Sequence, residues 1–135
     1  NGQSLRFCLR ANPTKRLANP KEGYESLKGK RVGLLREEEQ IEWLIRKGKD
    51  CGFEILMKEV RDEHGNVHEI PRVNICREGK IRGRKKSVNG SMIHLAVRFD
   101  GLLKVTDAEA FRKAIASGIG SAKAFGFGLL SIAPV

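Results

Sequence analysis

The chain has 135 residues, of which 40% are hydrophobic and 31% charged, a composition typical of one globular domain with its own core. Its 26 Lys and Arg against 16 Asp and Glu leave a formal net charge of +10. That charge favours a nucleic-acid partner, although an acidic protein or an anionic membrane would satisfy it too. No apolar run has the length of a membrane span and no signal-peptide pattern is present, so we expect no membrane partner.

Three cysteines, Cys8, Cys51 and Cys76, lie far apart and form no Cys-x-x-Cys pair. Their odd number and their spacing argue against a zinc site and against a disulfide framework. We therefore expect reduced thiols, a cytoplasmic protein and no metal. The first residue is Asn1 and a strand pattern begins almost at once, so we expect the chain to be a fragment of a longer protein.

Residues 5–11 predict the first strand, because apolar and polar side chains alternate strictly. The apolar face consists of Leu5, Phe7, Leu9 and Ala11. Arg6 and Arg10 share the other face, where a nucleic acid could lie, although a solvated face is the simpler interpretation of two arginines. Two Asn-Pro pairs then predict a long loop over residues 12–31.

A first helix is predicted over residues 37–51, with glutamates in its first turn and basic residues in its last, as the helix dipole prefers. Gly52 provides its C-terminal stop. Trp43 lies off the apolar stripe and is expected to cover an edge of the core. The stripe consists of Ile41, Leu44, Ile45 and Gly48.

Three strands are predicted between this helix and the next. Residues 53–61 and 70–77 flank a hairpin turn at 62–66. Residues 92–105 form the longest strand, in which Gly101 is predicted to make a bulge.

The second helix has a clear predicted start, because Thr106-Asp107-Ala108-Glu109 matches a capping box. In that motif the Thr106 hydroxyl and the Glu109 carboxylate each bind a free backbone N–H. Gly118 is expected to end the helix, and residues 127–132 form the last strand. The predicted buried stripe of the helix is Ala108, Phe111 and Ile115.

The order strand, helix, strands, helix, strand predicts an α+β fold of the ferredoxin-like (RRM-like) type. Such a domain has an antiparallel sheet with two helices on one face and leaves the other face open. We expect one such domain over residues 1–135.

Residues 77–86 are the most basic segment, with six Lys or Arg among ten residues. We interpret the segment as a basic hairpin or flexible finger before the longest strand. No aromatic side chain interrupts it, so phosphate contacts fit better than stacking of single-stranded bases. A solvated linker is the alternative, but the net charge of the chain favours nucleic acid.

The chain closes on a glycine-rich segment, in which Gly118-x-Gly120 and Gly126-x-Gly128 are separated by five residues. Glycine tolerates positive φ and close approach, so such a loop could cradle a polyanion. A Rossmann loop opens a helix, whereas this segment closes one, and the Gly-Lys-Ser/Thr of a Walker loop is absent. We therefore expect no small-molecule cofactor, and a helix cap with tight packing is the simpler role.

The three histidines suggest no catalytic centre. His64 and His68 flank Gly65-Asn66 and so share no helical face, which argues against a metal pair. His94 lies within a strand among apolar residues. No general acid–base pair and no nucleophile–base pair follows from the spacing, so binding is predicted for this chain and catalysis is not.

The two Gly-hydrophobic-Gly units followed by Leu129-Leu130 resemble the signature glycine loop of the repeat-associated CRISPR protein superfamily. Three segments resemble more specifically the CasE family, the repeat-RNA endoribonucleases of type I-E Cascade complexes. These segments are residues 9–13, 37–44 and 118–134.

The resemblance implies two ferredoxin-like domains, of which this chain is similar to the second, with the last strand edge of the first. It also implies a metal-independent reaction at the 3′ base of the repeat hairpin, which leaves a 2′,3′-cyclic phosphate. The family's catalytic histidine belongs to the N-terminal half. None of His64, His68 and His94 matches that motif, so no catalytic residue is expected here.

In the family a basic hairpin of the second domain grips the RNA stem, and the residues that fit are Lys80, Arg82, Arg84, Lys85 and Lys86. Further candidate RNA contacts are Lys15, Arg16 and Lys123, beside the glycines Gly118, Gly120, Gly126 and Gly128. The implied partners are the CRISPR repeat RNA hairpin, which stays bound after cleavage, and other Cascade subunits in antiviral defence. A stand-alone non-catalytic RNA-binding domain and a basic protein-interaction module remain the alternatives.

Overall fold

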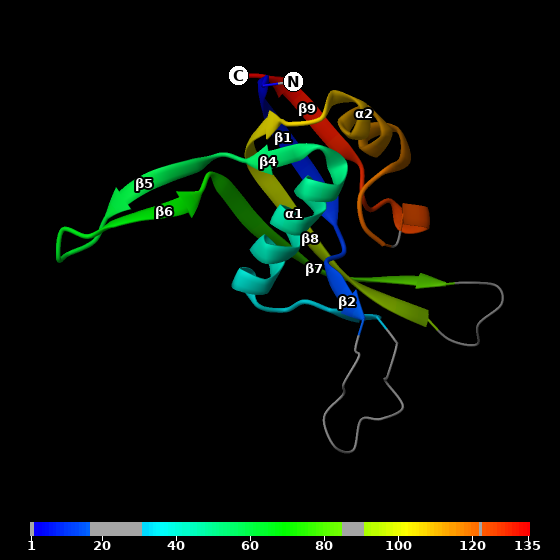
Figure 1. The fold of residues 1–135 in the computed structure, drawn as a ribbon. Helices are drawn as coiled ribbons and strands as arrows, with labels where there is room; N and C mark the ends of the chain where they lie inside the picture. The colour runs from blue at the N-terminus through cyan, green and yellow to red at the C-terminus, as the bar shows by residue number, and fades with distance from the viewer. Residues whose placement is uncertain (1, 17–30, 85–90, 122) are drawn as a thin grey trace.

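The structure of the protein, a computed structural model, describes residues 2–16, 31–84, 91–121 and 123–135. Its main element is a five-stranded antiparallel sheet (Figure 1). Four strands form a continuous path and a fifth pairs with β8 beside β4. In sheet order the path is β4 (Phe53–Ile55), β8 (Ser91–Val105), β1 (Ser4–Ala11) and β9 (Leu130–Pro134), and the fifth strand is β7 (Val73–Arg84).

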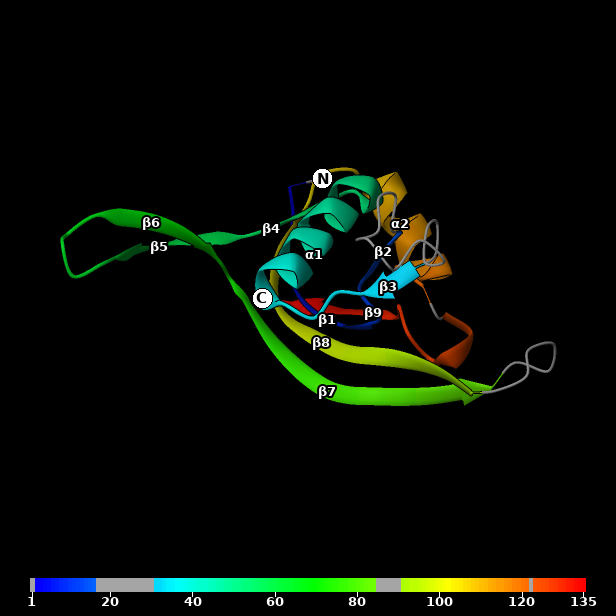
Figure 2. The same cartoon turned by 90° about the horizontal axis from the view of Figure 1, so that it is seen from below.

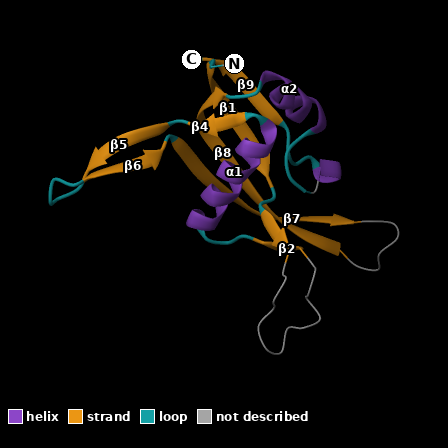
Figure 3. Ribbon diagram, in the orientation of Figure 1, coloured by secondary structure: helices purple, strands orange, loops and turns teal. Residues whose placement is uncertain are grey.

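Two helices, α1 (Glu37–Cys51) and α2 (Ala108–Ser117), lie on the same face of this sheet (Figures 1 and 2). No described helix covers the other face, as Figure 3 shows by element type. The chain order β1-α1-β4-β8-α2-β9 with the sheet order β4-β8-β1-β9 is that of a ferredoxin-like domain. The predicted α+β fold is therefore confirmed.

The core lies between the sheet and the helices. All four apolar residues predicted for the first strand are at most 6% exposed, and the alternate residues Val97, Phe99, Leu103 and Val105 of β8 meet them from the neighbouring strand. The helices contribute Trp43, Leu44, Phe111 and Ala114. Strict alternation was thus a sufficient signal for the buried face of β1.

The face of α1 that packs on the sheet differs from the predicted stripe. Trp43, expected at an edge, is 2% exposed and stacks on Phe99 with ring centroids 6.0 Å apart. Ile45, expected inside, is 36% exposed. The buried face includes the polar Gln40, whose Nε2 donates to the Leu34 carbonyl oxygen at 2.9 Å. Gly48 is buried as predicted and lies against Phe53, where an added Cβ would come 2.7 Å from the Phe53 carbonyl oxygen.

The cap of α2 also differs from the prediction. The Asp107 carboxylate, and not the Thr106 hydroxyl, accepts hydrogen bonds from the Glu109 and Ala110 backbone N–H groups at 3.1 and 3.2 Å. The helix begins one residue later as a result, at Ala108. Gly118 ends it with φ of +84°, as predicted.

A two-stranded ribbon, β5 (Met57–Arg61) and β6 (Val67–Pro71), leaves the sheet between β4 and β7. The predicted single strand over 53–61 therefore breaks at Leu56. At the branch point the Arg72 N–H donates to the Leu56 carbonyl oxygen at 2.7 Å, and the Leu102 N–H donates to that of Arg72 at 3.1 Å. Gly101 makes no bulge; it is required because a Cβ there would lie 2.2 Å from the Arg72 carbonyl oxygen.

The predicted loop over 12–31 and the last strand are corrected as well. Short strands β2 (Thr14–Arg16) and β3 (Arg31–Gly33) pair antiparallel, and residues 17–30 lie outside the described part of the chain. The last strand starts at Leu130, three residues later than predicted. Gly128 precedes it with φ of +90°, a conformation incompatible with an extended strand.

Candidate nucleic-acid interface

The basic segment 77–86 lies at the end of a long antiparallel ribbon formed by β7 and β8. Lys80, Arg82 and Arg84 occupy alternate positions of β7, opposite Leu95, Ile93 and Ser91 of β8. Alternate positions of a strand belong to one face of the ribbon. The hairpin interpretation therefore holds for residues 77–84, whereas Lys85, Lys86 and the predicted turn at Asn89-Gly90 lie outside the described residues.

A β-bulge lies at the base of this ribbon, whereas a bulge was predicted at Gly101. The register between β7 and β8 shifts between Arg77 and Gly79, so Glu78 is the extra residue. Its carboxylate accepts from the Arg10 Nε at 3.1 Å, and the Arg10 guanidinium lies 4.9 Å from the centre of the Phe127 ring. This bulge thus joins β7, β1 and the glycine-rich segment.

The helix-free face of the sheet is only weakly basic. Arg98 pairs with Asp100 at 2.9 Å, as Arg10 pairs with Glu78, so both arginines face a carboxylate. A hollow of about 450 Å³ beside them has ten lining residues, of which only Arg6 and Asp100 are charged. Burial and the neighbouring Asp100 carboxylate raise the pKa of the Cys8 thiol. The charges of Arg10 and Arg98 are therefore paired, whereas the sequence of residues 77–86 holds six Lys or Arg against one Glu.

Asn12 connects the ribbon to the glycine-rich segment. Its Oδ1 accepts from the Leu95 N–H of β8 at 3.2 Å, and its Nδ2 donates to the Ser121 Oγ at 3.2 Å. The Ser121 Oγ also lies 3.4 Å from the Thr14 Oγ1 and donates to the Asn12 carbonyl oxygen. Composition and motif reasoning did not single out Asn12 or Ser121, although both lie in segments that carry the resemblance to the CasE family.

The glycines of the terminal segment allow this junction to close. All four have positive φ, between +84° and +90°. A Cβ at Gly120 would lie 2.8 Å from the Trp43 ring, and a Cβ at Gly128 would lie 2.5 Å from the Ile119 carbonyl oxygen. The Gly128 N–H donates to the Arg10 carbonyl oxygen at 2.8 Å. Segments 9–13, 37–44 and 118–134 therefore meet in one place.

The remaining candidate cations lie around this junction. Lys15, on β2 beside Thr14, is exposed and its Nζ lies 3.8 Å from a Glu39 carboxylate oxygen. Arg16 is the last residue of β2. Lys123 is exposed in the short 3₁₀ helix η2 (Lys123–Phe125), two residues after Ser121. Hydrogen bonds through Asn12 and Ser121 thus connect the elements that carry Lys15 and Lys123 with the ribbon.

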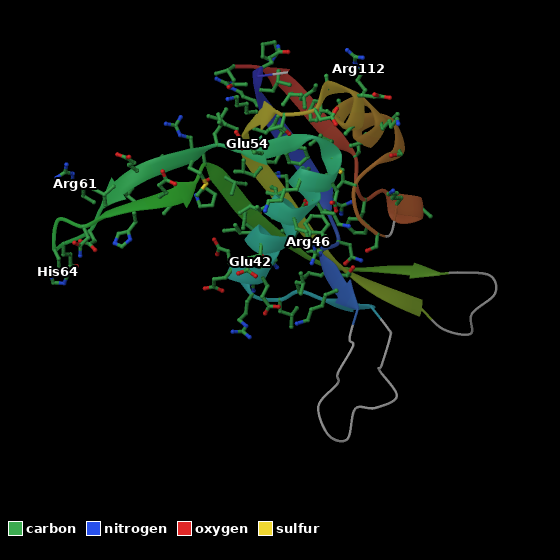
Figure 4. The ribbon with its side chains drawn as sticks, viewed as in Figure 1. Glu42, Arg46, Glu54, Arg61, His64 and Arg112 are labelled. Carbon is green, nitrogen blue, oxygen red and sulfur yellow. The ribbon has the colours of Figure 1, made fainter. Side chains whose placement is uncertain are left out.

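The histidines lie apart from this interface. His64 is at the far end of the β5–β6 ribbon (Figure 4), and the His68 Nε2 lies 2.8 Å from the Asp62 carboxylate there. His94 is a position of β8 opposite Ile81. Within the described residues no three His, Cys, Asp or Glu side chains come together as metal ligands would. Nor is any described helix both long and apolar enough to cross a membrane.

Comparison with known proteins extends the resemblance over the whole chain. Residues 1–134 match the family described as CRISPR associated protein. The chain is 39% identical over 137 residues to the CRISPR-associated endoribonuclease Cse3 of Thermus thermophilus, covering 98% of this chain and 57% of that protein. It is 35% identical over 139 residues to the CRISPR system Cascade subunit CasE of Escherichia coli, covering 99% of this chain and 60% of that protein. The chain thus spans little more than half the length of these curated relatives.

Solved structures agree with the sequence matches. Thermus thermophilus Cse3 bound to an RNA representing a pre-cleavage complex has a TM-score of 0.71 and 37% identity, over 98% of this chain and 54% of that one. Cas6e from Escherichia coli K-12 has a TM-score of 0.67 and 35% identity, over 99% of this chain and 62% of that one. The resemblance to the CasE family is confirmed, and the chain belongs to the CRISPR associated protein family.

Proposed function

We propose that this chain is the C-terminal, RNA-binding part of a CasE-type CRISPR endoribonuclease. One observation carries the proposal: the three segments that resemble the family meet beside the base of the basic ribbon. Segment 9–13 meets the glycine-rich segment through Asn12 and Ser121, and segment 37–44 meets it through Trp43 against Gly120. Relatives of this chain are described as endoribonucleases and as bound to RNA. The partner proposed here is accordingly the stem-loop of a CRISPR repeat RNA.

The ribbon suits a base-paired RNA stem. Three cations at alternate strand positions repeat every ~6.6 Å and so extend over roughly 13 Å. The major groove of an RNA helix is too narrow for side chains to read, so contact with the phosphate backbone is the main source of affinity. Lys80, Arg82 and Arg84 would supply this contact with Lys85 and Lys86, while Lys15, Arg16 and Lys123 extend the charged surface beside the junction.

Cleavage is proposed for the full-length protein, with the histidine supplied by its N-terminal half. The 2′-hydroxyl upstream of the scissile phosphate attacks phosphorus and gives up its proton to a base. The bond to the 5′-oxygen breaks, that oxygen takes a proton, and a 2′,3′-cyclic phosphate remains. The role of this chain is to hold the stem and to offset phosphate charge, which positions the reacting groups without a metal.

The cellular setting follows from the same proposal. We place the protein in the cytoplasm, where the three cysteines, all unbridged in the structure, are kept reduced. There it would remain on its hairpin product as one subunit of a Cascade complex. A relative of this chain, 27% identical and with a TM-score of 0.64, lies in a solved CRISPR RNA-guided surveillance complex.

The proposal is tested by incubating the full-length protein with its repeat RNA in the presence of EDTA. Cleavage at the 3′ base of the hairpin, with a 2′,3′-cyclic phosphate end and retention of the hairpin, supports it. Equal affinity for the repeat and for an unrelated stem-loop would instead favour the protein-interaction module. Specific binding without cleavage by the full-length protein would favour a non-catalytic RNA-binding domain.

A further inference from the structure

The RNA proposal assigns no role to the β5–β6 ribbon, which projects from the ferredoxin-like body. It projects from the body at the end opposite to the described end of the basic β7–β8 ribbon, in both views (Figures 1 and 2). Residues 57–71 hold two basic and four acidic side chains, a net charge of −2 with the histidines neutral, in a chain of +10. An RNA would be repelled by this ribbon, which therefore suits a different class of partner.

The ribbon also exposes apolar side chains. Four of the nine large hydrophobic residues that are exposed in the described part of the chain lie here, namely Met57 at 41%, Val60 at 37%, Val67 at 50% and Ile70 at 37%. A two-stranded ribbon alone is of marginal stability in water, and three strands or a packed face are needed to stabilise it. A protein surface that covers one face would supply that packing.

The strand register decides which face is suited to this role. Met57 is opposite Pro71, Glu59 opposite Glu69 and Arg61 opposite Val67, so these pairs share one face. We call this the acidic face of the ribbon. Lys58, Val60, His68 and Ile70 lie on the other face.

Glu59 and Glu69 form the centre of the acidic face. Like charges directly across an antiparallel pair are destabilising, and neither carboxylate forms an ion pair with a described residue. Arg61, two positions along the same face, forms no ion pair with either of them, so a cation of a partner placed between the two carboxylates would relieve the repulsion. Met57 at the base and Val67 toward the tip provide apolar contacts on either side of that position.

The turn at the tip of the ribbon is held by hydrogen bonds of Asp62. The Asp62 Oδ1 accepts from the His64 and Asn66 N–H groups, each at 2.9 Å, and its Oδ2 lies 2.8 Å from the His68 Nε2. Gly65 supplies the positive φ of +77° that the turn requires. A preformed element loses little conformational entropy on binding, which favours association.

We propose that the acidic face of the β5–β6 ribbon docks a protein subunit that presents a Lys or Arg between two apolar contacts. The inference rests on the proposed function, because the subunit is sought in the complex that holds the same RNA. With RNA on the basic ribbon and protein on the acidic one, both partners bind at once. Tethering through shared RNA raises the effective concentration, so a small contact is sufficient.

The test uses the full-length protein loaded with its repeat hairpin and titrated into a purified Cascade assembly that lacks this subunit. Met57→Ser with Val67→Ser should weaken its binding by roughly tenfold. Glu59→Lys with Glu69→Lys should weaken it further and reverse its salt dependence. The matched control is Val60→Ser with Ile70→Ser, which removes two exposed apolar side chains from the opposite face and should change binding less than about twofold.

Separate readouts keep this inference distinct from the proposed function. The two serine variants should bind the hairpin RNA as the wild type does, and the Glu→Lys variant should bind it at least as tightly. Equal losses of assembly from both faces, or none from the acidic face, would overturn the inference while leaving the RNA proposal intact. A drop in hairpin affinity would show that RNA occupies the acidic face. A wild-type dimer that the acidic-face variants abolish would show that a second copy of the chain occupies it. Either result would also overturn the inference.

Discussion

Single side chains at the junction determine how the basic ribbon is held. Asn12 is 6% exposed and binds both the Leu95 N–H and the Ser121 hydroxyl. Removal of one partner from a buried hydrogen bond leaves the other unsatisfied, at a cost of about 1–3 kcal/mol. Asn12 therefore fixes the position of the ribbon relative to the glycine-rich segment.

Gly120 and Gly126 provide a matched pair for the glycine-rich segment. Both have positive φ, +86° and +85°, but a Cβ at Gly120 would meet the Trp43 ring whereas nothing lies within 4 Å of one at Gly126. Gly126→Ala should cost only the backbone strain, about 1–2 kcal/mol. Gly120→Ala should cost a further 1–3 kcal/mol or so from overpacking. Urea unfolding measures both, and equal losses would contradict the contact with Trp43.

At the scale of elements, the start of α2 was predicted to within one residue, but its cap is the Asp107 carboxylate and not the Thr106 hydroxyl. We predict that Asp107→Ala lowers the free energy of unfolding by about 0.5–2 kcal/mol, because two backbone N–H groups lose their acceptor. Thr106→Ala should change it by less than about 0.5 kcal/mol. Thermal or urea unfolding of the two variants distinguishes the two caps. A larger loss of unfolding free energy for Thr106→Ala would show that the Thr106 hydroxyl caps the helix, as the capping box predicts.

Features that depend on local sequence were the ones that could be predicted. The span 37–51 of α1 and the buried face of β1 follow from glycine, charge and alternation within each segment. The departure of the β5–β6 ribbon from the sheet at Leu56 could not be predicted, because it depends on hydrogen bonds to Arg72. The basic ribbon followed from composition, whereas the role of Asn12 depends on partners 83 and 109 residues away.

The tip of the β5–β6 ribbon should respond to acid. The hydrogen bond from His68, followed by that from the Asn66 N–H, lowers the pKa of Asp62 from its ordinary 3.8. Because the folded pKa is the lower one, the contribution of Asp62 to the turn is complete above pH 3.8 and is lost as the pH falls through the folded value.

We expect an NMR titration of the Asp62 carboxyl carbon to have its midpoint below 3.8, with the His64 and Asn66 amides shifting in parallel. His68→Ala should move that midpoint up, since the largest cause of the shift is removed. A midpoint at or above 3.8 in the wild type would show that the carboxylate does not hold the turn.

At the scale of the whole molecule, charge is divided between two ribbons that project from opposite sides of one ferredoxin-like body (Figure 1). The basic β7–β8 ribbon is proposed for the RNA stem and the acidic β5–β6 ribbon for a protein subunit. The body between them carries the junction of segments that identifies the family. If both proposals hold, one small domain binds both partners without competition.

The most direct test of the central claim is the affinity of the full-length protein for its repeat hairpin over a range of salt concentrations. Changing Lys80, Arg82 and Arg84 together to Ala should weaken binding at least ~10-fold and make the plot of log affinity against log salt shallower by about 2. The matched control changes three exposed helix cations, Lys49, Arg112 and Lys113, and should leave both quantities unchanged. If the ribbon variant keeps the affinity and salt slope of the wild type, the assignment of the β7–β8 ribbon as the RNA-binding element is wrong.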